Sequence, residues 1–263
     1  MRSRVARPAG VIRRKMSGRA DAIRSRAMPI RAPSDEPLPP YLPLLDPDHF
    51  RDPEFFRGLE QIGYRTVLLG GTGGARMAAA VEQVRKATQL RIVMHPSSPG
   101  EVWPVDLVLL PAVMNSNSHF TRPFGSGAVA CAAAVAEQDI PYLPLAYFVL
   151  GDSTAGWYAD AFKVRSKKII LAYCTYARMN GYRWIFLDYE DPSLSIEPAL
   201  IRMIREHTDV RLMVSDEFTP ASARSARAMG IDTIVTPSNL YEQAADPLAL
   251  AREFYAALLA GRT

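Results

Sequence analysis

The chain has 263 residues, of which 48% are hydrophobic and 22% charged, so it is long enough to bury one large core. No apolar run approaches the roughly 18 residues that a membrane-spanning helix needs. The two cysteines, Cys131 and Cys174, lie in apolar segments, so we expect small buried side chains rather than a disulfide or a metal pair. This usage fits a reducing, cytoplasmic compartment.

The first 40 residues differ in composition from the rest of the chain. They hold ten Lys and Arg against three acidic residues, a net charge of +7, and because the whole chain is +4, residues 41–263 carry −3. We expect residues 1–40 to form a disordered, Pro-rich basic leader and residues 41–263 to form one domain. The leader is interpreted either as a peripheral contact with an anionic membrane surface or as a dispensable extension, which we favour. The remainder has no basic stripe, which argues against nucleic-acid binding.

From residue 41 onward, short apolar runs alternate with longer stretches of helical period. We expect strands at residues 42–45, 66–69, 91–94, 107–110, 142–149, 184–187, 211–214 and 233–235. We expect helices at residues 53–62, 75–88, 127–137, 166–180, 195–206, 220–229 and 247–260. Eight strands apolar enough to be buried on both faces predict an α/β fold, a closed (β/α)₈ TIM barrel. An open doubly wound sheet is the alternative, although it would not naturally contain eight repeats.

One strand–helix unit breaks the pattern. Only residues 96–106, PSSPGEVWPVD, separate the third strand from the fourth, and this segment contains three prolines and a glycine. Proline has no backbone N–H and interrupts helices, so no helix fits there. We therefore expect the third helix to be replaced by a loop, which leaves a gap in the outer ring for something long and apolar.

The stretch VLLGGTGGA, residues 67–75, places four glycines and a threonine directly behind the second strand. It fails the dinucleotide-binding fingerprint, because the third glycine would fall on Arg76 and the next strand ends in His95 rather than in an acidic residue. It also fails the P-loop pattern, because no lysine follows. A different phosphate site is therefore needed to explain the glycines.

In a TIM barrel, the chemistry lies at the carboxyl ends of the strands. Those positions are rich here in carboxylates, hydroxyls and amides, and poor in cysteine and histidine: Asp46, Asp48, Thr72, Asn115, Ser116, Asp152, Asp188, Glu190, Ser215, Asp216, Ser238 and Asn239. Oxygen ligands of this kind suit Mg²⁺, which takes one or two carboxylates together with phosphate oxygens, and they do not suit zinc.

Five segments taken in order, LLDPDHF, VLLGGTGG, VLLPAVMNSNS, YARMNGYRWIFLDYE and YEQA, resemble the geranylgeranylglyceryl phosphate synthase family of barrel prenyltransferases. The resemblance covers about residues 42–250, and that family also lacks its third helix. Its chemistry joins a prenyl diphosphate to a hydroxyl of a glycerol phosphate. The resemblance thus implies a Mg²⁺-dependent prenyltransferase with small-molecule substrates, and a homodimer.

The resemblance also implies roles for individual residues. Asp46 and Thr72 match the positions that hold Mg²⁺, and the prenyl diphosphate would lie against Gly70, Gly71, Thr72, Asn115 and Ser116. Asp188 aligns with the proposed general base, and Glu190, two residues on, is the alternative. His95 is the best placed of the four histidines for catalysis, but none of them is persuasive. Trp103, Phe120, Phe124 and Trp157 are candidates for lining the channel of the hydrocarbon tail.

The acceptor end departs from the family. Where the family has glycine-rich phosphate loops after its last three strands, this chain has Glu190-Asp191, Ser215-Asp216-Glu217 and Pro237-Ser238, and carboxylates repel a phosphate. The family's lysine two places before the first aspartate is Leu44, and the first tyrosine of its Tyr-Leu-Glu motif is Phe186. The residues that we expect to bind the acceptor are Lys163, Arg165, Lys167, Tyr189, Ser215, Ser238 and Asn239.

These departures are similar to those of the family branch that acts in phosphoglycolipid (moenomycin-type) antibiotic biosynthesis. The expected reaction is then transfer of a farnesyl group from farnesyl diphosphate to the 2-hydroxyl of 3-phosphoglycerate. Two alternatives stay open. One is prenyl transfer to glycerol 1-phosphate, as in a geranylgeranyl- or heptaprenylglyceryl phosphate synthase, and the other is a catalytically silent barrel that binds a polyprenyl phosphate.

Overall fold

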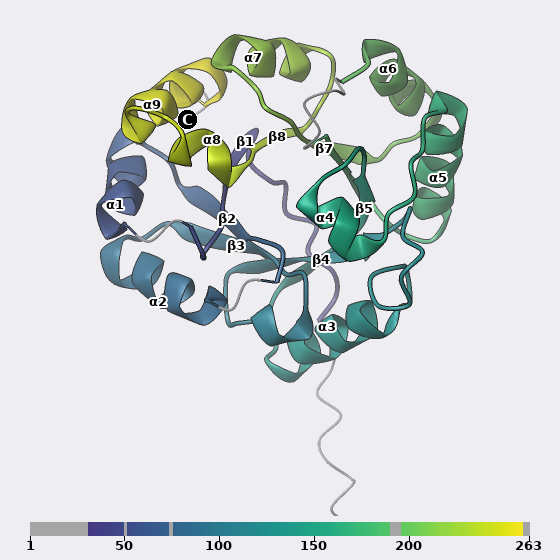
Figure 1. The fold of residues 1–263 in the computed structure, drawn as a ribbon, viewed down its shortest axis with the longest axis horizontal. Helices are drawn as coiled ribbons and strands as arrows, with labels where there is room; N and C mark the ends of the chain where they lie inside the picture. Colours follow the sequence, from purple (N-terminus) through teal and green to yellow (C-terminus); the bar gives the residue numbers. More distant parts are fainter. Residues whose placement is uncertain (1–30, 50–51, 74–75, 190–195, 260–263) are drawn as a thin grey trace, which may run out of the picture. The chain divides into compact units, whose positions relative to one another are not determined.

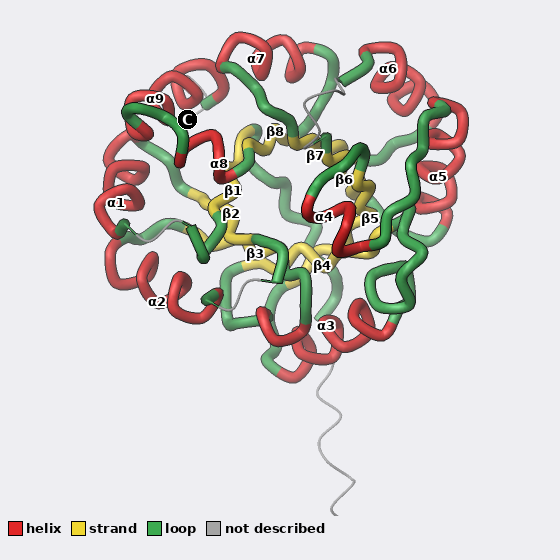
Figure 2. The backbone as a smooth tube through the Cα atoms, viewed as in Figure 1, coloured by secondary structure: helices red, strands yellow, loops and turns green. Residues whose placement is uncertain are grey.

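Eight parallel strands form a closed barrel in chain order, and β1 pairs with β8 to complete it. The computed structural model describes residues 31–49, 52–73, 76–189 and 196–259. The strands are β1 (Tyr41–Leu45), β2 (Thr66–Gly70), β3 (Arg91–His95), β4 (Leu107–Val113), β5 (Tyr142–Val149), β6 (Trp184–Asp188), β7 (Arg211–Ser215) and β8 (Thr233–Thr236). Figure 2 shows them as a ring inside the helices. The predicted TIM barrel is confirmed, and the open sheet is excluded.

Long helices surround the barrel, and two short ones, α4 and α8, follow β5 and β8 (Figure 1). The helices are α1 (Pro53–Ile62), α2 (Met77–Ala87), α3 (Ser126–Glu137), α4 (Thr154–Ala159), α5 (Lys167–Met179), α6 (Pro198–His207), α7 (Pro220–Ala228), α8 (Ser238–Glu242) and α9 (Pro247–Leu258). Helix α1 shows why the predicted bounds hold. The Asp52 side chain caps its start, Pro53 occupies the first turn, and Gly63 ends it with a φ of 117°.

The connection between β3 and β4 contains no α-helix, as predicted. Residues 96–106 are all described, and they form a single 3₁₀ turn, Pro99–Glu101. The buried Glu101 carboxylate holds the turn by accepting hydrogen bonds from the backbone N–H and the hydroxyl of Ser97, at 2.7 and 2.6 Å. These bonds to its side chain help to fix the shape of the loop without α-helical hydrogen bonds.

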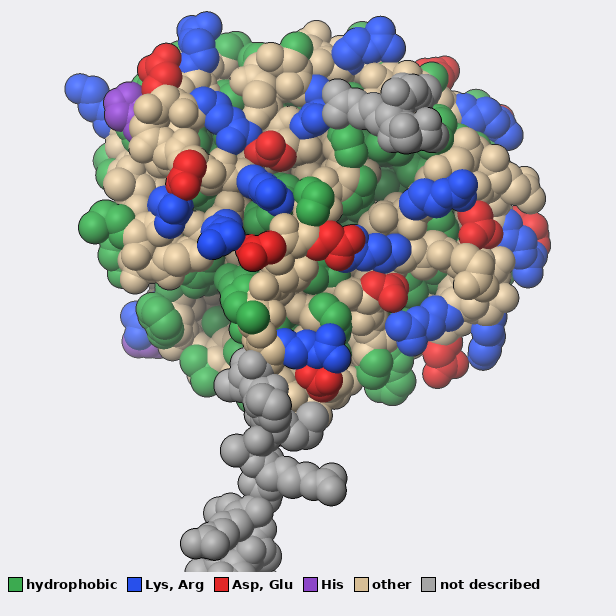
Figure 3. Space-filling view, turned by 180° about the vertical axis from the view of Figure 1, so that it is seen from behind, with side chains coloured by type: hydrophobic (Ala, Val, Ile, Leu, Met, Phe, Trp, Pro, Cys, Tyr) green, Lys and Arg blue, Asp and Glu red, His purple; other side chains and the backbone are tan. Residues whose placement is uncertain are grey.

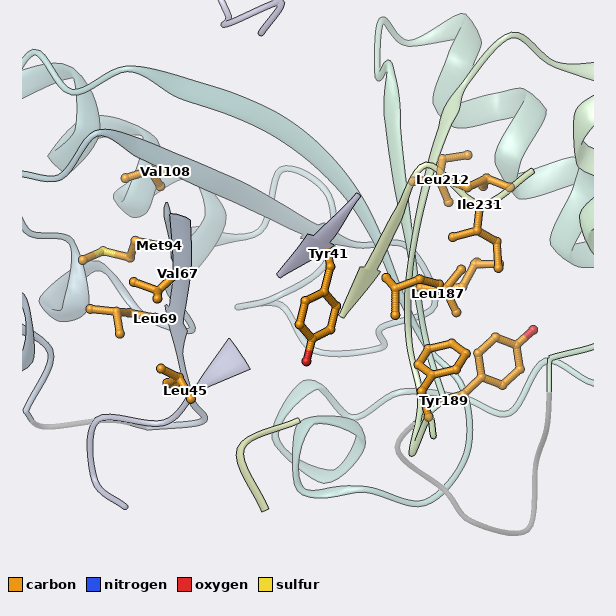
Figure 4. Close-up of a cluster of buried hydrophobic side chains, with 14 of the residues drawn as sticks. Tyr41, Leu45, Val67, Leu69, Met94, Val108, Leu187, Tyr189, Leu212 and Ile231 are labelled. Atoms are coloured by element: carbon orange, nitrogen blue, oxygen red, sulfur yellow. The ribbon is translucent and has the colours of Figure 1, made fainter. Parts of the chain in front are cut away.

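Strand side chains alternate between two cores, because successive residues of a strand point to opposite faces. The outer core packs strands against helices, and Figure 4 shows part of it, including Leu45, Leu69 and Leu187. The inner core fills the barrel and includes Leu68, Val93 and Phe186. By the same alternation, the last residue of β6, Asp188, points into the barrel, whereas its neighbour Tyr189 belongs to the outer core (Figure 4).

The segment before β1 corrects one prediction. Residues 31–40 were expected to belong to the disordered leader, but the compact unit begins at Arg31. Leu38 is only 6% exposed and packs in the inner core, and the carbonyl groups of Pro39 and Pro40 accept hydrogen bonds from Thr233 and Ile234. Residues 31–40 therefore form a strap on the barrel, and residues 1–30 lie outside the described part.

Two tyrosines join the first strand to the last helices. The hydroxyl of Tyr41 in β1 hydrogen-bonds to the hydroxyl of Thr236 in β8 at 2.7 Å and to the hydroxyl of Tyr241 in α8. The ring of Tyr41 also stacks on Phe254 of α9, with centroids 5.1 Å apart. All of these side chains are fully buried. This group closes the barrel at its β1–β8 seam.

Among the helices that are described, none is both long and apolar enough to cross a membrane. On the face shown in Figure 3, basic and acidic side chains are interspersed. Cys131 and Cys174 are buried free thiols, and burial raises their pKa to about 11 and about 12, so both stay protonated at neutral pH.

Candidate active site

A wide pocket of 1090 Å³ lies where the strands end, as the tip residues predicted. Its walls come from at least four of the strand ends: Asp46 and Asp48 after β1, Gly70, Gly71 and Thr72 at the end of β2, Gly151 and Asp152 after β5, and Ser238 and Asn239 after β8. Glu217, which follows β7, also lines it. The closed barrel thus brings together residues that lie almost 200 positions apart in the chain.

Asp46 and Gly71 lie side by side in the lining of this pocket. A Cβ atom on Gly71 would lie 2.6 Å from the Asp46 carboxylate, so any side chain there would force the carboxylate to shift. The carboxylate is fixed by an Asx turn, in which its Oδ1 accepts the backbone N–H of Asp48 at 2.8 Å. Glycine at position 71 therefore lets the β2 loop approach the carboxylate that follows β1.

The wide pocket is strongly acidic. Six carboxylates line it: Asp46, Asp48, Asp152, Asp160, Glu217 and Glu242. Among its described lining residues, the one basic side chain is that of His49. The Nδ1 atom of His49 lies 3.7 Å from the Glu242 carboxylate. Arg76 does not line the pocket, but its Nε atom lies 3.8 Å from the Asp48 carboxylate. Burial raises the pKa of Asp46, since a half-buried carboxylate is poorly solvated. Such a site attracts a cation, and an anionic ligand would bring one with it.

These residues fit a magnesium ion carried by a phosphate. Among the described residues, no three His, Cys, Asp or Glu side chains form a cluster that could hold a metal. Mg²⁺ does not need one, because it commonly takes one or two carboxylates and fills its other positions with phosphate oxygens and water. Asp46 is poorly solvated and presented beside Gly71, and Thr72 lines the same pocket. Asp46, with the Thr72 hydroxyl close by, would hold the ion.

A second, apolar pocket shares Thr72, in the loop after β2, with the wide pocket. It has a volume of 60 Å³, and its walls come from the β3–β4 loop, β4, β5, α3 and α4. Phe120, Cys131 and Tyr158 line it, together with Thr72, which lines both pockets. Of the other predicted channel residues, Trp157 lines the wide pocket and is 83% exposed, while Phe124 is 81% and Trp103 is 40% exposed. The apolar pocket has room for only the first part of an apolar tail, whose polar head would lie beyond Thr72 in the wide pocket.

The predicted general base, Asp188, lies deep in the barrel. This residue is 2% exposed, and the hydroxyl of Tyr147 in β5 donates a hydrogen bond to its Oδ2 atom. Tyr147 stacks on Phe186, with ring centroids 5.1 Å apart, and His95 stands edge-on to both rings. Burial lowers the pKa of His95 to about 4, so its imidazole is neutral at pH 7. The alternative base, Glu190, lies outside the described residues.

Asn115 and Ser116 are not available to a diphosphate, which corrects their predicted role. The Asn115 side chain donates to the carbonyl oxygens of Val149 and Phe162 at 2.7 and 3.0 Å, and accepts from the Val149 N–H at 3.2 Å. Ser116 donates to the carbonyl of Ala159 at 2.6 Å. Neither lines either pocket. Both side chains brace β4 against β5 and α4.

The residues expected at the acceptor are dispersed. Ser238 and Asn239 line the wide pocket, and the Ser238 hydroxyl bonds to Glu242. Lys163 lies beside the pocket, where its ammonium group pairs with Asp152 at 2.6 Å. Lys167 pairs instead with Glu197 next to α6, and Arg165 is exposed and lines neither pocket.

Tyr189 and Ser215 were also predicted to bind the acceptor, and their side chains point in opposite directions. Tyr189 packs in the outer core, so it cannot face the acceptor, because alternation turns it away from the barrel interior. Ser215 points inward beside Asp188, its register partner, and its buried hydroxyl has no hydrogen-bond partner among the described residues. Tyr147 was not predicted at all. The signal that could have found it is the alternation of β5, which turns Leu143, Leu145 and Tyr147 into the barrel.

The sequence profile of the PcrB family matches residues 34–255, which is most of the chain. The chain belongs to the PcrB family. Two curated relatives are geranylgeranylglyceryl phosphate synthases. The one from Cenarchaeum symbiosum is 31% identical over 189 residues (68% of this chain, 75% of the relative), and the one from Korarchaeum cryptofilum is 28% identical over 230 residues (82% and 92%). Membership of this family places the protein among the prenyltransferases.

The solved structures agree on the PcrB fold. The (S)-3-O-geranylgeranylglyceryl phosphate synthase of Thermoplasma acidophilum, determined with sn-glycerol-1-phosphate, superposes with a TM-score of 0.75 at 20% identity, over 84% of this chain and 93% of that one. The corresponding enzyme of Thermoplasma volcanium gives a TM-score of 0.71 at 18% identity, over 83% and 91%. At these identities the likeness supports the shared barrel, and the site is argued from the residues of this chain.

Proposed function

We propose that this protein transfers a prenyl group from a prenyl diphosphate to a hydroxyl group of a phosphorylated three-carbon acceptor. The observation that carries this proposal is the position of Thr72, which lines both the wide acidic pocket and the apolar pocket. A prenyl diphosphate has this same division into a charged head and a hydrocarbon tail. Family membership supports the reaction class.

The residues of this chain have distinct tasks in the proposed reaction. Gly70 and Gly71 let the backbone approach the diphosphate, and the Thr72 hydroxyl donates a hydrogen bond to it. When bound, Mg²⁺ neutralises charge on the diphosphate and makes it a better leaving group. Asp188, which is buried, is the group that finally holds the proton released by the acceptor hydroxyl.

Two acceptors fit this chemistry, and different observations favour them. The comparisons favour glycerol 1-phosphate, because the curated relatives are geranylgeranylglyceryl phosphate synthases and one solved relative was determined with that substrate. In that case the prenyl donor would be longer than farnesyl diphosphate, as in those relatives. This acceptor requires a phosphate site in or beside the acidic wide pocket.

The second candidate is transfer of a farnesyl group to the 2-hydroxyl of 3-phosphoglycerate, and it rests on the departure of the acceptor end of this chain from the family's pattern. Glu217 lines the wide pocket, and Asp216 beside it is half-buried, so burial raises its pKa. These carboxylates stand where the resemblance predicts phosphate-binding glycines. The acceptor's anionic groups would then lie toward the β5 side, where Lys163 pairs with Asp152.

One incubation separates these candidates. The purified protein is mixed with labelled farnesyl or geranylgeranyl diphosphate, Mg²⁺ and either glycerol 1-phosphate or 3-phosphoglycerate, and the ether product is quantified. Product with only one acceptor selects that candidate. No product in any combination, with prenyl diphosphate still bound, would support the catalytically silent barrel and overturn the proposal. A cytoplasmic location and a homodimer stay predictions.

A further inference from the structure

Tyr147 connects the two parts of the proposed active site. Its ring lines the apolar pocket together with Thr72 and His95, and its hydroxyl donates to the carboxylate of Asp188. The ring is 7% exposed, and Phe186 faces it as its register partner on β6. The tyrosine thus lies between the loop proposed to hold the diphosphate and the group proposed to take up the proton.

Asp188 is poorly placed to meet the acceptor directly. Among the described residues that line the two pockets, Tyr147 is present and Asp188 is absent. Asp188 is 2% exposed, and the hydroxyl of Tyr147 donates a hydrogen bond to its Oδ2 atom. The acceptor hydroxyl must reach C1 of the prenyl group where the two pockets meet, and Tyr147 lines one of these pockets whereas Asp188 lines neither.

The surroundings hold the phenol ring in one orientation. Phe186 stacks on it with an interplanar angle of 23°, and the His95 ring stands edge-on with its centroid 5.0 Å away. Aromatic pairs at these separations have a preferred geometry, so the hydroxyl stays directed at Asp188. The neutral state of His95 at pH 7 also keeps a positive charge away from the carbon that becomes cationic.

We propose that Tyr147 is a catalytic residue that passes the proton of the acceptor hydroxyl to Asp188. This proposal rests on the proposed function. As the acceptor oxygen forms its bond to C1 of the prenyl group, the bond between C1 and the diphosphate oxygen breaks, and the diphosphate leaves with the electron pair. The acceptor proton moves to the oxygen of Tyr147, while the proton of Tyr147 moves to Oδ2 of Asp188. Tyr147 ends unchanged, and Asp188 ends protonated.

The test is the variant Tyr147→Phe, which removes one oxygen atom and keeps the ring. We expect kcat to fall about 100-fold, within the range for loss of a general acid–base group, while KM for the prenyl diphosphate changes less than about twofold. The matched control is Tyr173→Phe. Tyr173 of α5 packs against Phe148 outside the barrel and lines neither pocket, so kcat should stay near normal.

A double variant tests whether the two groups act in series. If Tyr147 and Asp188 carry the same proton, Tyr147→Phe combined with Asp188→Asn should lose no more activity than the slower single variant. Multiplied losses, or a Tyr147→Phe enzyme within twofold of wild type, would overturn the relay. Circular dichroism checks folding, and if Asp188→Asn does not fold, the comparison of the two Tyr→Phe variants decides. A wild-type enzyme without any transfer would instead refute the proposed function.

Discussion

The carboxylate of Asp46 occupies the space in which any residue other than glycine at position 71 would place its Cβ atom. Asp46 follows β1 and Gly71 follows β2, so the contact depends on the pairing of these two strands. Gly71 of the VLLGGTGGA stretch is explained by this approach to a neighbouring carboxylate as much as by the approach to a phosphate.

The first prediction concerns this contact. Gly71→Ala should lower kcat/KM by about 100-fold, since the added methyl group must displace the carboxylate, and displacements near 1 Å have effects of this size. Steady-state kinetics of prenyl transfer would measure it. Gly100→Ala is the matched control, because the nearest atom to its Cβ is 4.0 Å away. Equal activity of the two variants would remove Asp46 from the diphosphate site.

The second prediction separates structure from binding at Asn115. Asn115→Ala leaves two carbonyl groups and one N–H group without their side-chain partner in a buried region. We expect a loss of about 2 to 4 kcal/mol in the free energy of unfolding, measured by urea denaturation. The exposed Asn117→Ala serves as the control. A normally stable Asn115→Ala protein with a raised KM for prenyl diphosphate would restore the ligand-binding role.

The third prediction is a pH dependence that originates at His95. Because burial lowers its pKa from 6.5 to about 4, the unfolded chain binds a proton between these pH values and the folded chain does not. Stability is therefore unaffected by His95 above pH 6.5 and falls as the pH drops toward 4, by about 2 kcal/mol at pH 5. Urea denaturation at pH 7 and pH 5 measures the difference.

The comparison variant is His95→Gln, which does not titrate. It should lose about 2 kcal/mol less than wild type between pH 7 and pH 5. His207→Gln, at an exposed histidine on α6, should behave like wild type in the same experiment. An identical pH dependence in wild type and His95→Gln would show that His95 is protonated in the folded state.

The fourth prediction concerns the strap before β1. Leu38→Ala should reduce the free energy of unfolding by about 2 to 4 kcal/mol, because Leu38 is 6% exposed and packs in the inner core. Arg31→Ala, in the same strap, removes only an exposed ion pair to Asp139 and should destabilise the protein much less than Leu38→Ala. If both substitutions were equally mild, the strap would not belong to the folded unit.

Local signals made most of the fold predictable. Residues 53–62 were predicted as a helix and form α1 with those bounds, because Asp52, Pro53 and Gly63 each act through their own backbone conformation. Helix α4 was not predicted, since its six residues are too few for a helical period to appear. The strap was misassigned because its polar, Pro-rich composition conceals one buried leucine.

The site was less predictable, because the position of a residue at a strand end does not determine its hydrogen bonds. Thr72 and Asn115 both lie at strand ends, yet Thr72 faces two pockets and Asn115 is fully occupied by Val149 and Phe162. Those partners are 34 and 47 positions away, and only the folded barrel brings them together. For the same reason, Tyr147 is recognised as a candidate catalytic residue only in the folded barrel, where its hydroxyl donates a hydrogen bond to Asp188.

The seam made by Tyr41 and Tyr241 has a consequence for how the chain is made. Their hydroxyl groups are 200 positions apart, so the first strand cannot complete its hydrogen bonds until the last helices have left the ribosome. Partners this distant are slow to find each other and leave the intermediate exposed to aggregation. Synthesis of the C-terminal residues is therefore the step that allows the barrel to close, and nascent chains truncated before Tyr241 should depend on chaperones.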